Sequence, residues 1–210
     1  DGTGLTVLPA LIDTHVHFRV PGAEHKETWQ SGAEAAISGG VTTVLDMPNN
    51  NPVCVSRERL AEKKALIEAQ LKDVDIPLRY ELYIGASENY MEEIAPSKPE
   101  VCGIKVFMGA STGDLLLDDH EAFEKVCKIA ADNDMVVAVH AEDEEILQAG
   151  KKEYDGTTDV HDHSCIRDRE AAIVAATRAI DVAKKYDNRL NILNASTKEE
   201  VEMVRKAKAN

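Results

Sequence analysis

The chain has 210 residues, of which 43% are apolar, enough for the core of one domain or a large piece of one. Lysine and arginine total 24 against 38 aspartate and glutamate; a formal charge of −14 argues against nucleic acid as a partner, because phosphate binding requires a basic surface. No segment is apolar and long enough to span a membrane, and no secretory signal is visible. The four cysteines form no C-x-x-C pair, so we expect a cytoplasmic protein with buried free thiols.

Short apolar strands alternate with helical stretches along the sequence. In chain order, we expect strands over residues 8–17, 41–47, 78–84, 103–108, 135–141 and 189–195. We expect helices over residues 27–38, 57–72, 121–133 and 167–186, and a last helix that a capping box opens at residues 196–199.

Repeated βα units with continuous apolar strands predict an α/β fold, in which helices cover a parallel sheet. About six units are present, whereas a (β/α)8 barrel needs eight, so the sequence predicts either an open sheet or a truncated barrel. No element is visible before the first strand, and the sequence ends on a helix. We therefore expect residues 1–210 to form a single barrel domain that is incomplete at the C-terminus.

The end of the first predicted strand carries the most informative motif, a pair of histidines separated by one residue. Side chains alternate along a strand, so His15 and His17 point the same way and make half of a metal site. Arg19 has the same parity, and a guanidinium one step further out suits a carboxylate held beside the metal. The alternative is a strand with incidental histidines.

Two later strands carry further candidates. Lys105 lies inside an apolar strand, which is costly unless the amine is neutralised, paired or modified; carbamylation by carbon dioxide would give a carboxylate able to bridge two metals. The alternative is a lysine whose stem packs while its head reaches solvent. His140 ends the fifth strand at the level of the first histidine pair, which favours a metal ligand over an ordinary core histidine.

Polar residues outside the strands give weaker signals. Asn49 follows the second strand; asparagine is common in turns, but at a strand end its amide can also bind a substrate carboxylate or amide. His161 and His163 form a second pair, which we expect in a loop before a helix. We expect a solvated His161, and for His163 a structural role or one behind the metal ligands.

Together these residues resemble the cyclic-amide amidohydrolases, and among them the dihydroorotases most closely. The resemblance runs through essentially the whole chain and rests on segments 15–22, 39–43, 46–49, 103–107 and 139–142 and on His163 with Arg167. The Asp-Met-Pro-Asn block at 46–49 and Arg19 favour a dihydroorotase over a hydantoinase or an allantoinase.

The resemblance implies a (β/α)8 barrel with two zinc ions per subunit and a carboxylated lysine. By that match, His15 and His17 hold the first zinc and Lys105 bridges to the second. His140 binds the second zinc. The family carries another histidine in its sixth-strand motif, where this chain has Asn194, whose neutral amide oxygen is a much poorer zinc ligand. We therefore expect the second site to be weakened or absent.

The same resemblance implies interconversion of N-carbamoyl-L-aspartate and L-dihydroorotate in pyrimidine biosynthesis, by attack of a metal-activated water on the ring amide. Arg19 and Asn49 would hold the substrate carboxylate. The family's general-base aspartate follows the eighth strand, so we expect it beyond Asn210 and expect residues 1–210 alone to be inactive. The expected partner is a small molecule with a carboxylate, not nucleic acid or a membrane; a homodimer is compatible.

Two other functions remain open at this point. A non-catalytic homologue that keeps the barrel as a scaffold would explain Asn194. A ring opener of the hydantoinase or allantoinase kind would explain the metal motif, and a substrate panel separates it, because Arg19 should reject rings without a carboxylate.

Overall fold

The computed structural model describes residues 2–72, 74–109 and 115–209. Six strands in these residues form one parallel sheet in which every strand pairs with its neighbours in the sequence. The strands are β1 (Leu11–Val16), β2 (Val41–Asp46), β3 (Arg79–Gly85), β4 (Gly103–Phe107), β5 (Val137–His140) and β6 (Leu190–Leu193). The arrangement is six consecutive βα units of a (β/α)8-type barrel, which confirms the predicted fold class.

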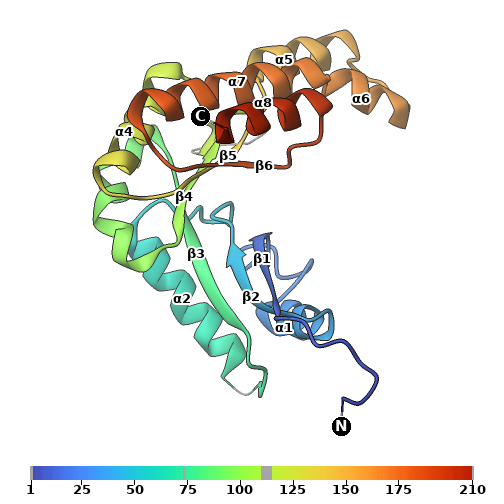
Figure 1. Cartoon of the computed structure of the whole chain (residues 1–210), viewed down its shortest axis with the longest axis vertical. Helices are drawn as coiled ribbons and strands as arrows, with labels where there is room; N and C mark the ends of the chain where they lie inside the picture. The colour runs from blue at the N-terminus through green and yellow to red at the C-terminus, as the bar shows by residue number, and fades with distance from the viewer. Residues whose placement is uncertain (1, 73, 110–114, 210) are drawn as a thin grey trace.

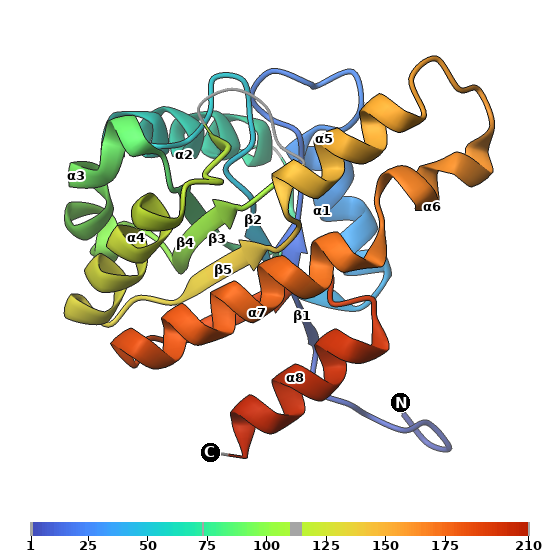
Figure 2. The same ribbon diagram turned by 90° about the horizontal axis from the view of Figure 1, so that it is seen from above.

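Helices follow the strands and cover one side of the sheet. They are α1 (Trp29–Ser38), α2 (Arg57–Leu71), α3 (Met91–Ile94), α4 (His120–Asp132), α5 (Glu144–Glu153), α6 (His163–Ile166), α7 (Arg169–Tyr186) and α8 (Lys198–Lys208). Figure 1 shows α2, α4 and α7 along the outside of the curled sheet, and Figure 2 shows α5 and α6 extending to one side. Within the described residues, none of the helices could cross a membrane.

The register of the strands decides which residues face the concave side of the sheet. Ile104 and Val106 belong to the main core between sheet and helices, so the alternate residues of β4, Lys105 and Phe107, face the other way. Phe107 pairs with His140 in the register of β4 and β5. The carboxyl ends of neighbouring strands therefore bring these polar and aromatic side chains to one end of the sheet.

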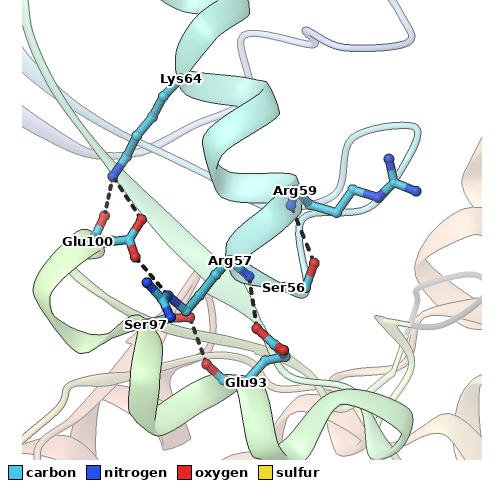
Figure 3. Close-up of polar contacts among 7 residues, drawn as sticks. All are labelled: Ser56, Arg57, Arg59, Lys64, Glu93, Ser97 and Glu100. Carbon is cyan, nitrogen blue, oxygen red and sulfur yellow. Dashed lines mark hydrogen bonds and ion pairs between the residues drawn. The ribbon is translucent and has the colours of Figure 1, made fainter.

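Polar contacts connect the N-terminal half of α2 to neighbouring segments. Ser56 caps this helix, and its Oγ accepts a hydrogen bond from the backbone N–H of Arg59 at 3.3 Å. Arg57 Nε donates to Glu100 at 3.0 Å, and Lys64 Nζ donates to the Glu100 carbonyl at 3.1 Å. Figure 3 shows both side chains reaching from α2 to the segment that precedes β4.

The secondary structure differs from the sequence-based expectations at the start of α8 and after β5. The capping box predicted at 196–199 is wrong by one residue: Thr197 is the N-cap of α8, and Glu200 closes the box. Helix α5 was not predicted, although Asp143 caps it and its ends carry the charges that favour a helix, two glutamates in the first turn and two lysines in the last.

Candidate functional site

A pocket of about 560 Å³ lies at the carboxyl ends of the strands, where (β/α)8 barrels hold their active sites. It brings together every site residue predicted from the sequence, together with two that were not assigned a role. The lining residues are His15, His17, Arg19, Asn49, Lys105, Phe107, His140, Arg167 and Asn194.

The two histidines of the first strand converge. Their Nε2 atoms lie 3.2 Å apart, and Asn49 Oδ1 lies 2.7 Å from Nδ1 of His17. An amide oxygen can only accept, so this contact selects the His17 tautomer with a proton on Nδ1 and leaves Nε2 unprotonated, with a lone pair that can bind a metal. Burial lowers the pKa of His15 to about 4 and also lowers the pKa of His17. Both rings are therefore neutral at pH 7, the state that a metal requires.

Lys105 is the least satisfied polar side chain of the site. It is 0% exposed, its Nζ has no hydrogen-bond partner among the described residues, and it lies over the Phe107 ring, 4.5 Å from the ring centroid. Its head does not reach solvent, so the alternative of a snorkelling lysine is wrong. Burial lowers the pKa of Lys105 to about 7. A buried amine without a partner is costly, and modification or a metal would remove that cost.

His140 is held by an ion pair that the sequence did not reveal. Its Nε2 lies 2.5 Å from Glu142 Oε2, and Arg167 binds the same carboxylate, with Nε 3.0 Å from Oε1 and Nη2 on Oε2. Burial alone would raise the pKa of Glu142, but the hydrogen bonds from His140 and Arg167 outweigh it and lower the pKa to about 2. The carboxylate is therefore ionised at neutral pH. Nδ1 of His140 remains, 3.4 Å from Asn194 Oδ1.

The donor set fits one zinc ion better than two. Among the described residues, no three His, Cys, Asp or Glu side chains form a metal-binding group. His15 and His17 offer two converging nitrogens, and Lys105 would add an oxygen once carboxylated. For a second metal ion, the described residues offer Nδ1 of His140 and the neutral amide of Asn194, which are a weaker set of ligands than the first.

Arg19 and Arg167 give the pocket two guanidinium groups. Arg19 lies beyond the end of β1 and has a φ of 63°, a left-handed conformation that is rare for a residue with a side chain. Because Glu142 already binds Arg167, Arg19 is better placed than Arg167 to bind a carboxylate.

The second histidine pair lies outside this pocket. His161 is exposed and pairs with Asp159 at 2.8 Å, as expected for a solvated histidine. The loop expected here is wrong: residues Val160–Asp162 form a 3₁₀ turn, and His163 begins α6. His163 is exposed and does not line the pocket, so a position behind the metal ligands finds no support in the described residues.

Comparisons with known proteins agree with this geometry. The profile of the amidohydrolase family matches residues 6–177. A dihydroorotase from Halobacterium salinarum is 37% identical over 196 residues, which are 93% of this chain and 44% of that protein. An allantoinase from Bacillus velezensis is 31% identical over 98% of this chain and 45% of its own length.

The solved structures with a similar fold include hydantoinases. The L-hydantoinase (dihydropyrimidinase) from Arthrobacter aurescens superposes with a TM-score of 0.88 at 26% identity, over 96% of this chain and 45% of that one. The chain thus spans slightly less than half the length of these relatives.

Proposed function

The chain belongs to the amidohydrolase family, and on that basis we propose that it is part of a zinc-dependent hydrolase that opens a cyclic amide carrying a carboxylate. The substrate pair we propose is L-dihydroorotate and N-carbamoyl-L-aspartate, which would place the protein in pyrimidine biosynthesis. The observation that carries the proposal is the convergence of His15 and His17 beside Lys105, which has no hydrogen-bond partner among the residues that the structure describes, in a pocket that also holds Arg19. The dihydroorotase and hydantoinase relatives support the reaction class.

Different residues of the site would bind the two metal ions. We propose that the Nε2 atoms of His15 and His17 and a carboxylated Lys105 hold one zinc ion, and that His140 and Asn194 bind a second ion weakly. Bound zinc would lower the pKa of a water molecule and polarise the ring carbonyl.

The remaining residues orient the ligands and the substrate. Asn49 Oδ1 keeps His17 in the tautomer that presents Nε2, which leaves the Asn49 amide N–H groups to donate to the substrate. The Arg19 guanidinium binds the carboxylate through two parallel hydrogen bonds. The Phe107 ring lies over Lys105 and keeps bulk water from it. We place the general base on an aspartate outside residues 1–210, as the resemblance to dihydroorotases implies.

A substrate panel tests this function. We expect the full-length protein loaded with zinc to open L-dihydroorotate much faster than hydantoin or allantoin. Arg19→Met should remove the preference, whereas Arg79→Met, a control at an exposed arginine outside the pocket, should keep it. Fast opening of the rings without a carboxylate would instead support a function of the hydantoinase or allantoinase kind.

Asn194 favours one other candidate, a non-catalytic scaffold. A protein that has lost hydrolysis could tolerate an amide in place of a zinc ligand. Zinc analysis separates the two: an active enzyme retains zinc and turns over with Asn194 present. A protein that binds zinc and opens the ring only after Asn194→His would be a scaffold.

A further inference from the structure

The left-handed turn at Arg19 is held from both sides. The backbone N–H of Phe18 donates to Asp46 Oδ1 at 2.8 Å, and Asn50 Nδ2 donates to the carbonyl of Val20 at 2.9 Å. Both acceptor and donor come from the end of β2 and the loop after it. The residues that flank Arg19 are thus fixed by side chains, which a strained backbone conformation requires if it is to persist.

One buried lysine connects these two side chains. Lys63 of α2 forms an ion pair with Asp46 at 2.5 Å, and both side chains are 1% exposed. Its Nζ also donates to Asn50 Oδ1 at 2.8 Å and to the carbonyl of Met47 at 2.9 Å. Two of the three ammonium N–H groups thus donate to oxygens of the loop after β2, and the positive charge lies beside the Asp46 carboxylate.

Packing alone gives no reason for this network. Replacing a buried ion pair with apolar side chains of similar volume is often neutral or stabilising, so burial of two charges is weak evidence for a role in stability. Lys63 does not line the pocket at the strand ends, yet each of its partners touches a segment that does. The network joins α2 to the loops after β1 and β2, which carry Arg19 and Asn49.

We propose that Lys63 is a positioning residue: through Asp46 and Asn50 it imposes the left-handed turn at Arg19 and so directs the guanidinium toward the substrate carboxylate. The proposal rests on the proposed function, in which Arg19 binds that carboxylate. It requires that disturbing Lys63 change the recognition of the carboxylate more than the chemistry of ring opening.

Lys63→Met tests this directly in the full-length, zinc-loaded protein. We expect the KM for L-dihydroorotate to rise about tenfold or more with a smaller change in kcat, while zinc content and the slow opening of hydantoin stay close to the wild type. Lys64→Met is the matched control, because it makes the same chemical change at the next position, where the lysine contacts Glu100 (Figure 3) and none of the partners of Lys63. This control should keep the wild-type KM.

A milder variant covers the case in which Lys63→Met does not fold. Asn50→Ala removes the contact with Val20 and leaves the ion pair between Lys63 and Asp46 in place. We expect a smaller rise in KM for L-dihydroorotate. Asn51→Ala, at the exposed neighbouring position, is its control and should leave the KM unchanged.

The outcomes separate positioning from plain stability. A rise in KM that is specific to the substrate with a carboxylate supports the proposal. An unchanged KM in the folded variants, or equal losses for both substrates that follow the fall in Tm, would overturn it. If the wild-type protein opens neither ring, the proposed function fails, and a crystal structure of Asn50→Ala then decides: loss of the positive φ at Arg19 supports the positioning role, and its retention refutes it.

Discussion

Burial sets the reactivity of single side chains in this protein, and Lys105 shows it most clearly. The amine is buried and has no hydrogen-bond partner in the described part of the chain, and burial lowers its pKa to about 7 from an ordinary value of 10.5. Near neutral pH a large fraction of the amine is therefore uncharged, the form that reacts with carbon dioxide. An arrangement that is unfavourable for folding is thus suited to making a metal ligand.

Replacing Lys105 tests whether this side chain serves as a metal ligand. Lys105→Met removes the proposed third ligand, so we expect zinc affinity to fall more than about tenfold. That is at least the loss seen when a residue that hydrogen-bonds to a metal ligand is removed. Metal analysis after dialysis measures it, with Lys26→Met, at an exposed position, as the control. Zinc content equal to the wild type would show that Lys105 is not a ligand.

The same variant should change how stability depends on pH. In the metal-free protein the folded pKa of Lys105 lies below its unfolded value, so the unfolded chain binds more protons between pH 7 and 10.5. The destabilisation caused by burying Lys105 is therefore complete below this window and disappears as the pH rises through it. Denaturant melts at pH 7 and pH 9 should show a rise in stability in the wild type and a smaller one in Lys105→Met.

The four thiols should differ in reactivity because they differ in exposure. Burial raises the pKa of Cys54 to about 11 and of Cys127 to about 12, whereas Cys165 is exposed, contrary to the expectation that the free thiols would be buried. We expect iodoacetamide at pH 8 to modify Cys165 first, since alkylation requires an accessible thiolate. Peptide mass spectrometry gives the order, and equal rates at Cys54 and Cys165 would contradict it.

Strands and helices were predictable where a pattern is local. The alternation of side chains in a strand was enough to place His15 and His17 on one face, and the structure brings their Nε2 atoms together. Lys63 shows the limit. It lies beside Lys64 in a highly charged helix, where the sequence looks like a solvated surface, and only the packing of α2 on the strand ends reveals that it is buried.

Contacts between elements that are distant in the sequence could not be predicted either. Glu142 and Arg167 were part of the motif on which the resemblance rests, but their pairing behind His140 depends on the path from β5 to α7. The backbone conformation of Arg19 could not be predicted from the sequence either, because a left-handed backbone at an arginine is imposed by its surroundings and not by its own preference.

The start of α8 offers a test of a single cap. Thr197 Oγ1 accepts from the backbone of Glu200, and the buried Glu200 carboxylate accepts from the backbone N–H groups of Ser196 and Thr197. Thr197→Ala should lower the free energy of unfolding by about 1 kcal/mol. Ser196→Ala keeps every one of these contacts and should change it by only a few tenths. Equal effects in denaturant melts would contradict the assignment of Thr197 as the cap.

Both edges of the curled sheet leave apolar surface open. On β1, Leu11 is 58% and Ile12 63% exposed, and beside β6 a pocket of about 850 Å³ is lined largely by aliphatic side chains of α7 and α8. Exposed strand edges and apolar patches of this kind favour association.

We expect a polypeptide of residues 1–210 alone to bind an apolar dye, to associate as its concentration rises, and to open no L-dihydroorotate. Dye fluorescence, light scattering and a ring-opening assay measure the three properties, with the full-length protein as the comparison. A monodisperse polypeptide with full activity would show that these six βα units are sufficient.

The dependence of ring opening on zinc tests the central claim most directly. The rate with L-dihydroorotate is measured on the full-length protein as purified, after chelation, and after zinc is restored. The site built from His15, His17 and Lys105 predicts that activity disappears with the metal and returns with about one zinc per chain. Turnover that survives complete chelation, or a zinc-loaded protein that leaves the ring closed, would contradict it.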